Sequence, residues 1–291
     1  NPSAATFDGV HLHDDLLENL ERGAVEQQAQ SLAGLARRLA AISTDSLTGV
    51  ERVERPWIAA HIQGRLHELE KIRTWERNPQ LYGELLGASL AGQALFDFAP
   101  AEERARRVLS KLRQTPRFIQ SARDNIKDPP GIFVKGGLET LRGTLRFIES
   151  DLPRAFADVD DLGLLSDLAD AQVEALDSLK SYIAYLETDQ GPKARASFRL
   201  GADRFAAKLR FEEGLEIPLD RLLEIGLREL GEVQEQFRVA AGRVEPGDSR
   251  EVWRRVKDRH APPDGIVNAA RDQLARLSTF ISRRDLVTLP A

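Results

Sequence analysis

The chain has 291 residues, of which 42% are hydrophobic and 30% are charged, so it can bury a sizeable core and is too apolar to be disordered. Charged residues interrupt every long apolar stretch, which excludes a membrane-spanning helix. The net charge of −5 argues against nucleic acid as the main partner, and the absence of cysteine excludes disulfides and thiolate metal sites.

Both ends of the sequence are unusual. It begins at Asn1 and contains no methionine, so we expect a processing boundary at the N-terminus and a leader that could have been removed. The compartment therefore stays open, with the cytoplasm favoured and export as the alternative. At the other end, the β-branched apolar run Asp285–Ala291 predicts the start of a β-strand without a pairing partner. We therefore expect the sequence to stop in the middle of a larger fold.

A hydrophobic period of 3.6 residues dominates the sequence and predicts an all-α fold of about ten helices. Loops rich in proline, glycine and aspartate separate the helical segments, and no fixed-length repeat indicates a solenoid. We expect residues 1–291 to form a single all-helical region, with a possible sub-boundary near residues 188–198. The expected helices lie at about 17–42, 48–72, 78–96, 100–115, 116–125, 132–150, 165–188, 199–211, 219–241, 249–259 and 265–284.

Capping residues and prolines predict where several of these helices begin. Thr48 and Glu51 have the spacing of a capping box. The pair Asn78-Pro79 combines an N-cap residue with proline at the first helical position. Pro100 precedes two glutamates that favour a helix start, and Pro116 is expected to begin a separate helix.

The histidines do not have the spacing of a zinc site. A helical zinc pair requires two histidines four positions apart, whereas His61 and His67 are six apart and lie on different faces. His67-Glu68 begins like the zincin motif, but Lys71 occupies the position of the second histidine ligand. This segment is therefore interpreted as a solvated, charged helix face.

The acidic run Asp14-Asp15-Leu16-Leu17-Glu18 places carboxylates about one helical turn apart. Such carboxylates can hold Mg²⁺ against a diphosphate, as in all-helical isoprenoid synthases. No second motif of matching spacing occurs elsewhere in the sequence. An isoprenoid-synthase-like enzyme therefore stays a remote alternative to a capping or surface role for this run.

Six short segments occur in a characteristic order over nearly the whole chain: Gly9-Val-His11-Leu-His-Asp14, Trp75-Glu-Arg-Asn78-Pro79-Gln-Leu-Tyr82, Ala99-Pro100 through Arg104, Arg123-Asp-Asn125-Ile-Lys-Asp-Pro129-Pro130, Leu200-Gly201-Ala-Asp-Arg-Phe205 and Leu286-Val-Thr-Leu-Pro290. Together they resemble the N-terminal half of the bacterial domain-of-unknown-function 885 proteins. This resemblance implies that the helices form part of a larger, zincin-like helical fold.

The resemblance also implies where the chemistry lies. Family members carry a His-Glu pair followed by Pro-Gly-His, and later a Glu-Gly-Trp-Ala segment, which together look like a gluzincin metal site. Neither motif occurs in this sequence, so the resemblance assigns no catalytic residue and no metal ligand here. Zn²⁺ is implied only for the full-length parent.

In helical metallopeptidases of this kind, the N-terminal helices form one wall of the substrate cleft. The resemblance therefore makes His11, Asp14, Asn78 and Tyr82 candidates for cleft-facing side chains. The alternative is a structural role, with Asn78 as a helix cap, Tyr82 as a packed aromatic, and His11 and Asp14 holding a turn.

Two hypotheses from different classes follow. The first is the non-catalytic N-terminal half of a zinc-dependent peptidase or hydrolase, whose partners are the missing C-terminal half and a peptide. The second is a non-enzymatic helical binding module or scaffold that holds a partner helix or peptide in an apolar groove. A large exposed apolar patch in residues 265–291 is expected for the first hypothesis, and a polar, self-contained terminus for the second.

Overall fold

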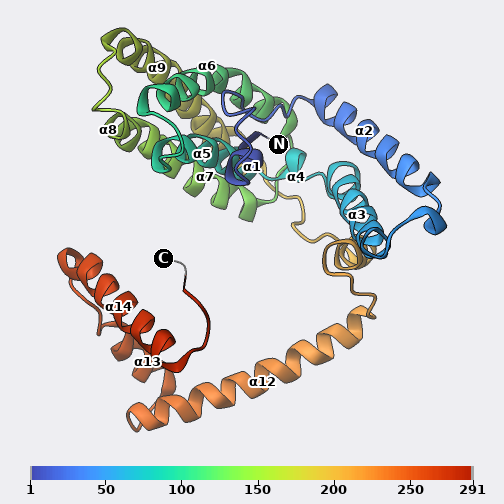
Figure 1. Cartoon of the computed structure of the whole chain (residues 1–291), viewed down its shortest axis with the longest axis vertical. Coiled ribbons are helices and arrows are strands. Elements are labelled where there is room, and N and C mark those ends of the chain that lie inside the picture. The colour runs from blue at the N-terminus through green and yellow to red at the C-terminus, as the bar shows by residue number, and fades with distance from the viewer. Residues whose placement is uncertain (1, 290–291) are drawn as a thin grey trace. The chain divides into compact units, whose positions relative to one another are not determined.

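A computed structural model describes residues 2–289, and it confirms the predicted all-α fold (Figure 1). No strand forms within this range, so the prediction of a strand beginning at residue 285 is wrong for residues 285–289. Asp285 instead ends the last helix in a left-handed conformation, with φ 50°. The apolar run after it stays irregular because no second strand offers backbone groups for pairing. Pro290 and Ala291 lie outside the described residues.

The chain divides into two compact units, the first ending at Ile217 and the second beginning at Pro218. The sub-boundary expected near residues 188–198 falls inside the first unit, where a π-helical turn and an extended stretch follow the ninth α-helix. The first unit contains α1 (Pro2–Phe7), α2 (Arg22–Ala41), η1 (Thr44–Ser46), α3 (Gly49–His67), η2 (Glu68–Ile72), α4 (Thr74–Arg77), α5 (Gln80–Leu95), α6 (Ala101–Asn125), α7 (Gly131–Arg146), η3 (Phe147–Asp151), α8 (Leu152–Ala155), α9 (Leu162–Tyr185), η4 (Leu186–Gln190), α10 (Gly191–Lys193), α11 (Ala202–Lys208) and η5 (Leu209–Glu213).

The main core of the first unit lies between four helices. Helix α6 packs against α9 and α5, and α5 packs in turn against α7. Their apolar faces meet in one continuous cluster, in which burial of each large side chain contributes about 1.5–3 kcal/mol. Its fully buried members include Tyr82, Leu86, Leu90, Leu112, Leu141, Leu179 and Tyr182.

Helix α6 is continuous through Pro116, so the prediction of a separate helix beginning there is wrong. Proline removes one backbone hydrogen bond and costs about 3 kcal/mol or more inside a helix. The residues around it nevertheless hold the helix together, because Leu112, Phe118 and Ile119 are all buried in the main core. Tertiary packing therefore outweighs the local cost of the proline.

Helices α2 and α3 form a hairpin beside this core (Figure 1). The predicted capping box at its second helix is confirmed: the Thr48 hydroxyl accepts the N–H of Glu51, and the Glu51 carboxylate accepts the N–H of Thr48. A smaller apolar cluster holds the base of the hairpin, and α3 also packs against η5. The buried members of this cluster are Val25, Ala29, Leu69 and Trp75.

The second unit contains α12 (Leu219–Val244), α13 (Ser249–Lys257), η6 (Pro263–Gly265) and α14 (Ile266–Arg284). Among its described residues only two apolar side chains are buried, those of Ala241 and Val252. Phe237 and Trp253 make an edge-to-face contact between α12 and α13, with ring centroids 6.2 Å apart. The remaining large apolar side chains of α12 and α14 are mostly exposed: Leu223, Leu227, Leu230, Val233, Val244, Ile266, Val267, Leu274, Leu277 and Phe280.

Candidate functional site

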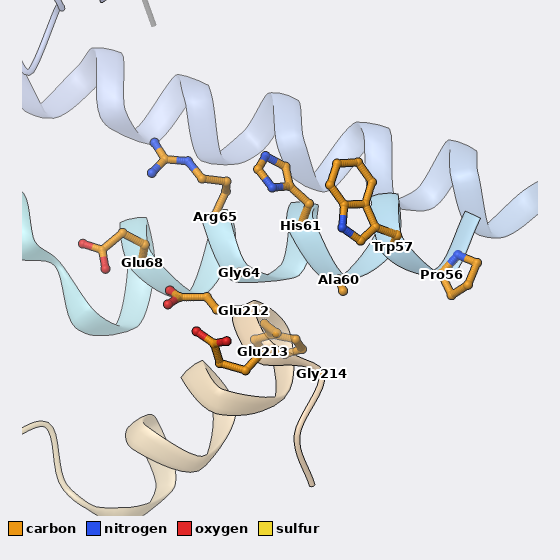
Figure 2. A pocket seen from close by; sticks show the side chains of 11 residues that line it. Pro56, Trp57, Ala60, His61, Gly64, Arg65, Glu68, Glu212, Glu213 and Gly214 are labelled. Carbon is orange, nitrogen blue, oxygen red and sulfur yellow. The ribbon is translucent and has the colours of Figure 1, made fainter. Parts of the chain in front are cut away.

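An open groove of about 720 Å³ lies between α3 and η5 in the first unit (Figure 2). Contacts of His67 connect the two sides of the groove. The His67 Nε2 atom lies 3.0 Å from the carbonyl oxygen of Arg204, and the His67 ring meets Phe211 edge-on, with centroids 5.9 Å apart. The groove is lined by Pro56, Trp57, Ala60, His61, Gly64, Arg65, Glu68, Phe211, Glu212, Glu213 and Gly214.

Helix α3 supplies a row of side chains to the groove. Trp57, His61 and Arg65 recur every four residues and therefore lie along one side of the helix, as Figure 2 shows. The Trp57 side chain is 71% exposed, and its ring stacks with that of His61 at a centroid distance of 6.1 Å. Glu68 follows, and its carboxylate accepts the backbone N–H of Thr74 at 3.2 Å.

The opposite wall is acidic. Glu212 and Glu213 reach from η5 toward α3 in Figure 2. Glu212 forms an ion pair with Lys208, whereas Glu213 makes no side-chain hydrogen bond or ion pair within residues 2–289. The lining carries three carboxylates and the guanidinium of Arg65, and two further cations stand beside it: Lys208 pairs with Glu212, and the Arg210 guanidinium lies 4.5 Å from the centroid of the Phe211 ring.

Two π-helical turns border the groove, η2 through Glu68 and η5 through Glu213. Both turns end in a left-handed residue, Arg73 with φ 58° and Gly214 with φ 66°. Turns of this kind are rare in proteins and frequently occur at functional sites. Two more such turns, η3 and η4, contribute no residue to the groove, so the turns shape its border without identifying it as a site.

In the part of the chain that the structure describes, no group of three or more His, Asp or Glu side chains is placed to hold a metal ion. None of the described helices has the length and apolar composition needed to cross a membrane.

His11 and Asp14 come together in a different, buried place. The Asp14 side chain is 1% exposed and accepts hydrogen bonds from the Thr6 hydroxyl at 2.5 Å and the Arg107 guanidinium at 2.7 Å. His11 Nδ1 lies 2.9 Å from the same carboxylate, and its ring stacks on Phe98. Burial alone would raise the pKa of Asp14, but the hydrogen bonds from Thr6 and His11 outweigh it, so the pKa lies below its ordinary value. Asp14 therefore anchors the N-terminal segment to α6.

Lys111 lies near this anchor and is fully buried. Its ammonium donates to the carbonyl oxygen of Ser89 at 3.0 Å. Burial lowers the pKa of Lys111, although the carboxylates of Glu18 and Asp14 favour its charged form. These contacts connect α5, α6 and the segment before α2 through polar groups inside the protein.

Asn78 and Tyr82 lie at the start of α5, away from the groove lining. The Asn78 side-chain oxygen accepts the N–H of Gln80 at 3.1 Å. Tyr82 is fully buried, donates its hydroxyl hydrogen to the carbonyl oxygen of Trp75 at 2.7 Å and accepts a hydrogen bond from Asn125 at 2.9 Å. Burial raises the pKa of Tyr82. The contact of Asn78 is typical of a residue that caps a turn, and the contacts of Tyr82 are typical of a packed aromatic. They agree with the structural role given above as the alternative to a cleft-facing one.

Comparison with known proteins identifies the family. The profile of the family described as "Bacterial protein of unknown function (DUF885)" matches residues 2–291. The chain belongs to the DUF885 family.

A solved structure from Shewanella oneidensis, described as "a putative lipoprotein of unknown function", has a similar fold, with a TM-score of 0.73 and 20% sequence identity. The match covers 100% of the DUF885 chain and 56% of that protein, so the chain spans just over half of its length. The search of curated proteins found no match.

The groove of this DUF885 chain was not predicted from the sequence. Trp57 lies next to the apolar stripe that contains Ile58 and Ile62. The four-residue spacing of Trp57, His61 and Arg65 was the available signal, because it indicates a second face of the same helix with aromatic and polar side chains. No signal in the sequence brings this face to η5.

Proposed function

We propose that this DUF885 chain is the non-catalytic helical part of a longer zinc-dependent hydrolase. In this proposal its helices form one wall of a cleft for peptide substrates. The metal ligands and the general base belong to residues outside the chain, in the His-Glu, Pro-Gly-His and Glu-Gly-Trp-Ala motifs that the family resemblance implies.

The exposed apolar surface of the second unit is the observation that carries the proposal. On α12, Leu223, Leu227 and Leu230 recur at helical spacing and are 61%, 59% and 52% exposed. On α14, Leu274 and Leu277 are 63% and 53% exposed. Burial of such side chains contributes about 1.5–3 kcal/mol each, so these faces gain free energy when further protein covers them.

The comparison structure supports the same proposal. Its protein is longer than the match, which leaves a substantial part of that chain beyond the region shared with this one. We infer that the corresponding residues of a longer DUF885 protein cover α12 and α14. The description of that relative as "a putative lipoprotein" supports export for the parent protein.

Metal analysis tests the proposal. Residues 1–291 and the longer reading frame that contains them are purified in parallel, and zinc is measured per chain by mass spectrometry. We expect about one tightly bound Zn²⁺ in the longer protein and none in residues 1–291. Stoichiometric zinc in residues 1–291, or none in the longer protein, would contradict the proposal.

A binding module without catalysis stays the second candidate, because the groove between α3 and η5 is itself suited to a ligand. The two candidates differ in how the second unit behaves. A self-contained module unfolds with the same midpoint whether or not the remaining part of the longer protein is added in trans, whereas the proposed hydrolase part is stabilised by it.

A further inference from the structure

We propose that the groove between α3 and η5 binds a short cationic peptide segment in which arginine or lysine alternates with an apolar residue. This site lies wholly in the first unit. It depends neither on zinc chemistry nor on coverage of α12 and α14, so it stands or fails independently of the proposed function.

The size and lining of the groove suit a peptide. Its volume of about 720 Å³ lies in the range of pockets that bind small ligands, and it opens to solvent along its length. Pro56 and Trp57 of α3 and Phe211 of η5 give the groove apolar surface beside its polar side chains. A peptide with alternating side chains can place apolar groups on this surface and charged groups at its edges.

Two carboxylates of the groove, those of Glu68 and Glu213, have no cationic partner in the described chain, and Arg65 is the one cation among the lining residues. Glu213 is free to pair with a ligand, since it has no side-chain partner within the described range 2–289. The partner of Glu212, Lys208, is 38% exposed, and an exposed pair of this kind contributes little and is readily exchanged. Carboxylates without a cationic partner favour a basic ligand over an acidic one.

Trp57 stacks with His61, yet it is 71% exposed and offers accessible ring surface for that cation. The buried Trp75 already has two guanidinium groups over its ring, those of Arg22 at 5.0 Å and Arg73 at 5.4 Å from the centroid. Over the exposed ring of Trp57, no Lys or Arg of the described chain lies in such a position. An arginine side chain of the peptide can therefore stack on Trp57 while its neighbours reach the carboxylates.

Fluorescence anisotropy with two synthetic peptides tests the site. The probe is a fluorescein-labelled octapeptide of alternating arginine and leucine, and its control has glutamate in place of every arginine. We expect saturable binding of the arginine peptide that weakens as salt is added, and no binding of the glutamate peptide.

Variants with matched controls decide whether the groove is responsible. We expect Trp57→Ala to weaken binding about tenfold and the double variant Glu212→Gln/Glu213→Gln to weaken it about fivefold. The controls are Trp253→Ala, which removes another exposed tryptophan, and Glu229→Gln/Glu232→Gln on α12; both should leave binding unchanged.

Circular dichroism of each variant checks that the fold is kept. The variant Trp57→Phe should retain part of the affinity for the arginine peptide, because phenylalanine keeps an aromatic face. The proposal is overturned if neither peptide binds saturably, if both peptides bind equally, or if the groove variants and the control variants have the same affinity.

Discussion

The two units of the chain use the same amphipathic helix pattern in opposite ways. In the first unit the apolar stripe of the amphipathic helix α6 is buried, with Val108 and Leu112 fully enclosed by neighbouring helices. In the second unit the leucine stripe of α12 is exposed, as at Leu223 and Leu227. The comparison teaches that a helical period identifies the face of a helix that is suited to burial, whereas the surrounding protein decides whether that face is buried.

The largest expected effect contrasts one leucine from each unit. Leu86→Ala removes a fully buried side chain and should lower the free energy of unfolding by about 2–5 kcal/mol. Leu227→Ala removes a side chain that is 59% exposed and should change the free energy of unfolding by about 0.5 kcal/mol or less. Urea denaturation of residues 1–291 measures both values. Equal losses would show that the α12 stripe is already buried in solution, and the contrast between the units would then be wrong.

A smaller effect is expected at the polar anchor of the first unit. Asp14→Asn replaces the carboxylate that binds Thr6 and Arg107, and it should cost about 1–3 kcal/mol at neutral pH. The neighbouring exposed Asp15→Asn is the control and should have little effect.

The pH dependence of Asp14→Asn sharpens this test. Because the folded-state pKa of Asp14 lies below the ordinary value of 3.8, its carboxylate binds a proton more weakly in the folded chain than in the unfolded chain. Its contribution is therefore complete above that ordinary value and is lost as the pH falls through the lowered pKa. Unfolding free energies measured between neutral and acidic pH should fall less steeply for Asp14→Asn than for the unchanged protein. Identical slopes would exclude Asp14 as a charged anchor.

The helices could be predicted from the sequence because their signals are local. The Thr48 and Glu51 capping box acts within one helical turn, and the amphipathic period acts within each helix. The failure at Pro116 has a tertiary cause, because Phe118 and its neighbours in α6 are buried against other helices, and this packing keeps α6 continuous. The predicted strand at the C-terminus failed because a strand depends on a partner that no local pattern supplies.

The candidate sites show the same limit. His11 and Asp14 could be identified together because they are three positions apart, but their partner Arg107 lies 93 positions beyond Asp14. The groove was missed since Trp57 and Glu213 come from distant parts of the sequence and meet only through packing of α3 on η5. Residues that meet through tertiary packing leave no periodic trace in the sequence.

Hydrogen exchange of α12 tests whether further protein covers the second unit. Amide exchange over residues 219–244 is compared between residues 1–291 alone and the longer protein that contains them, with the buried helix α6 as an internal reference. We expect α12 to exchange rapidly in residues 1–291 and to become strongly protected in the longer protein, while α6 is protected in both. Equal protection of α12 in the two proteins would contradict the proposal that further protein covers the second unit.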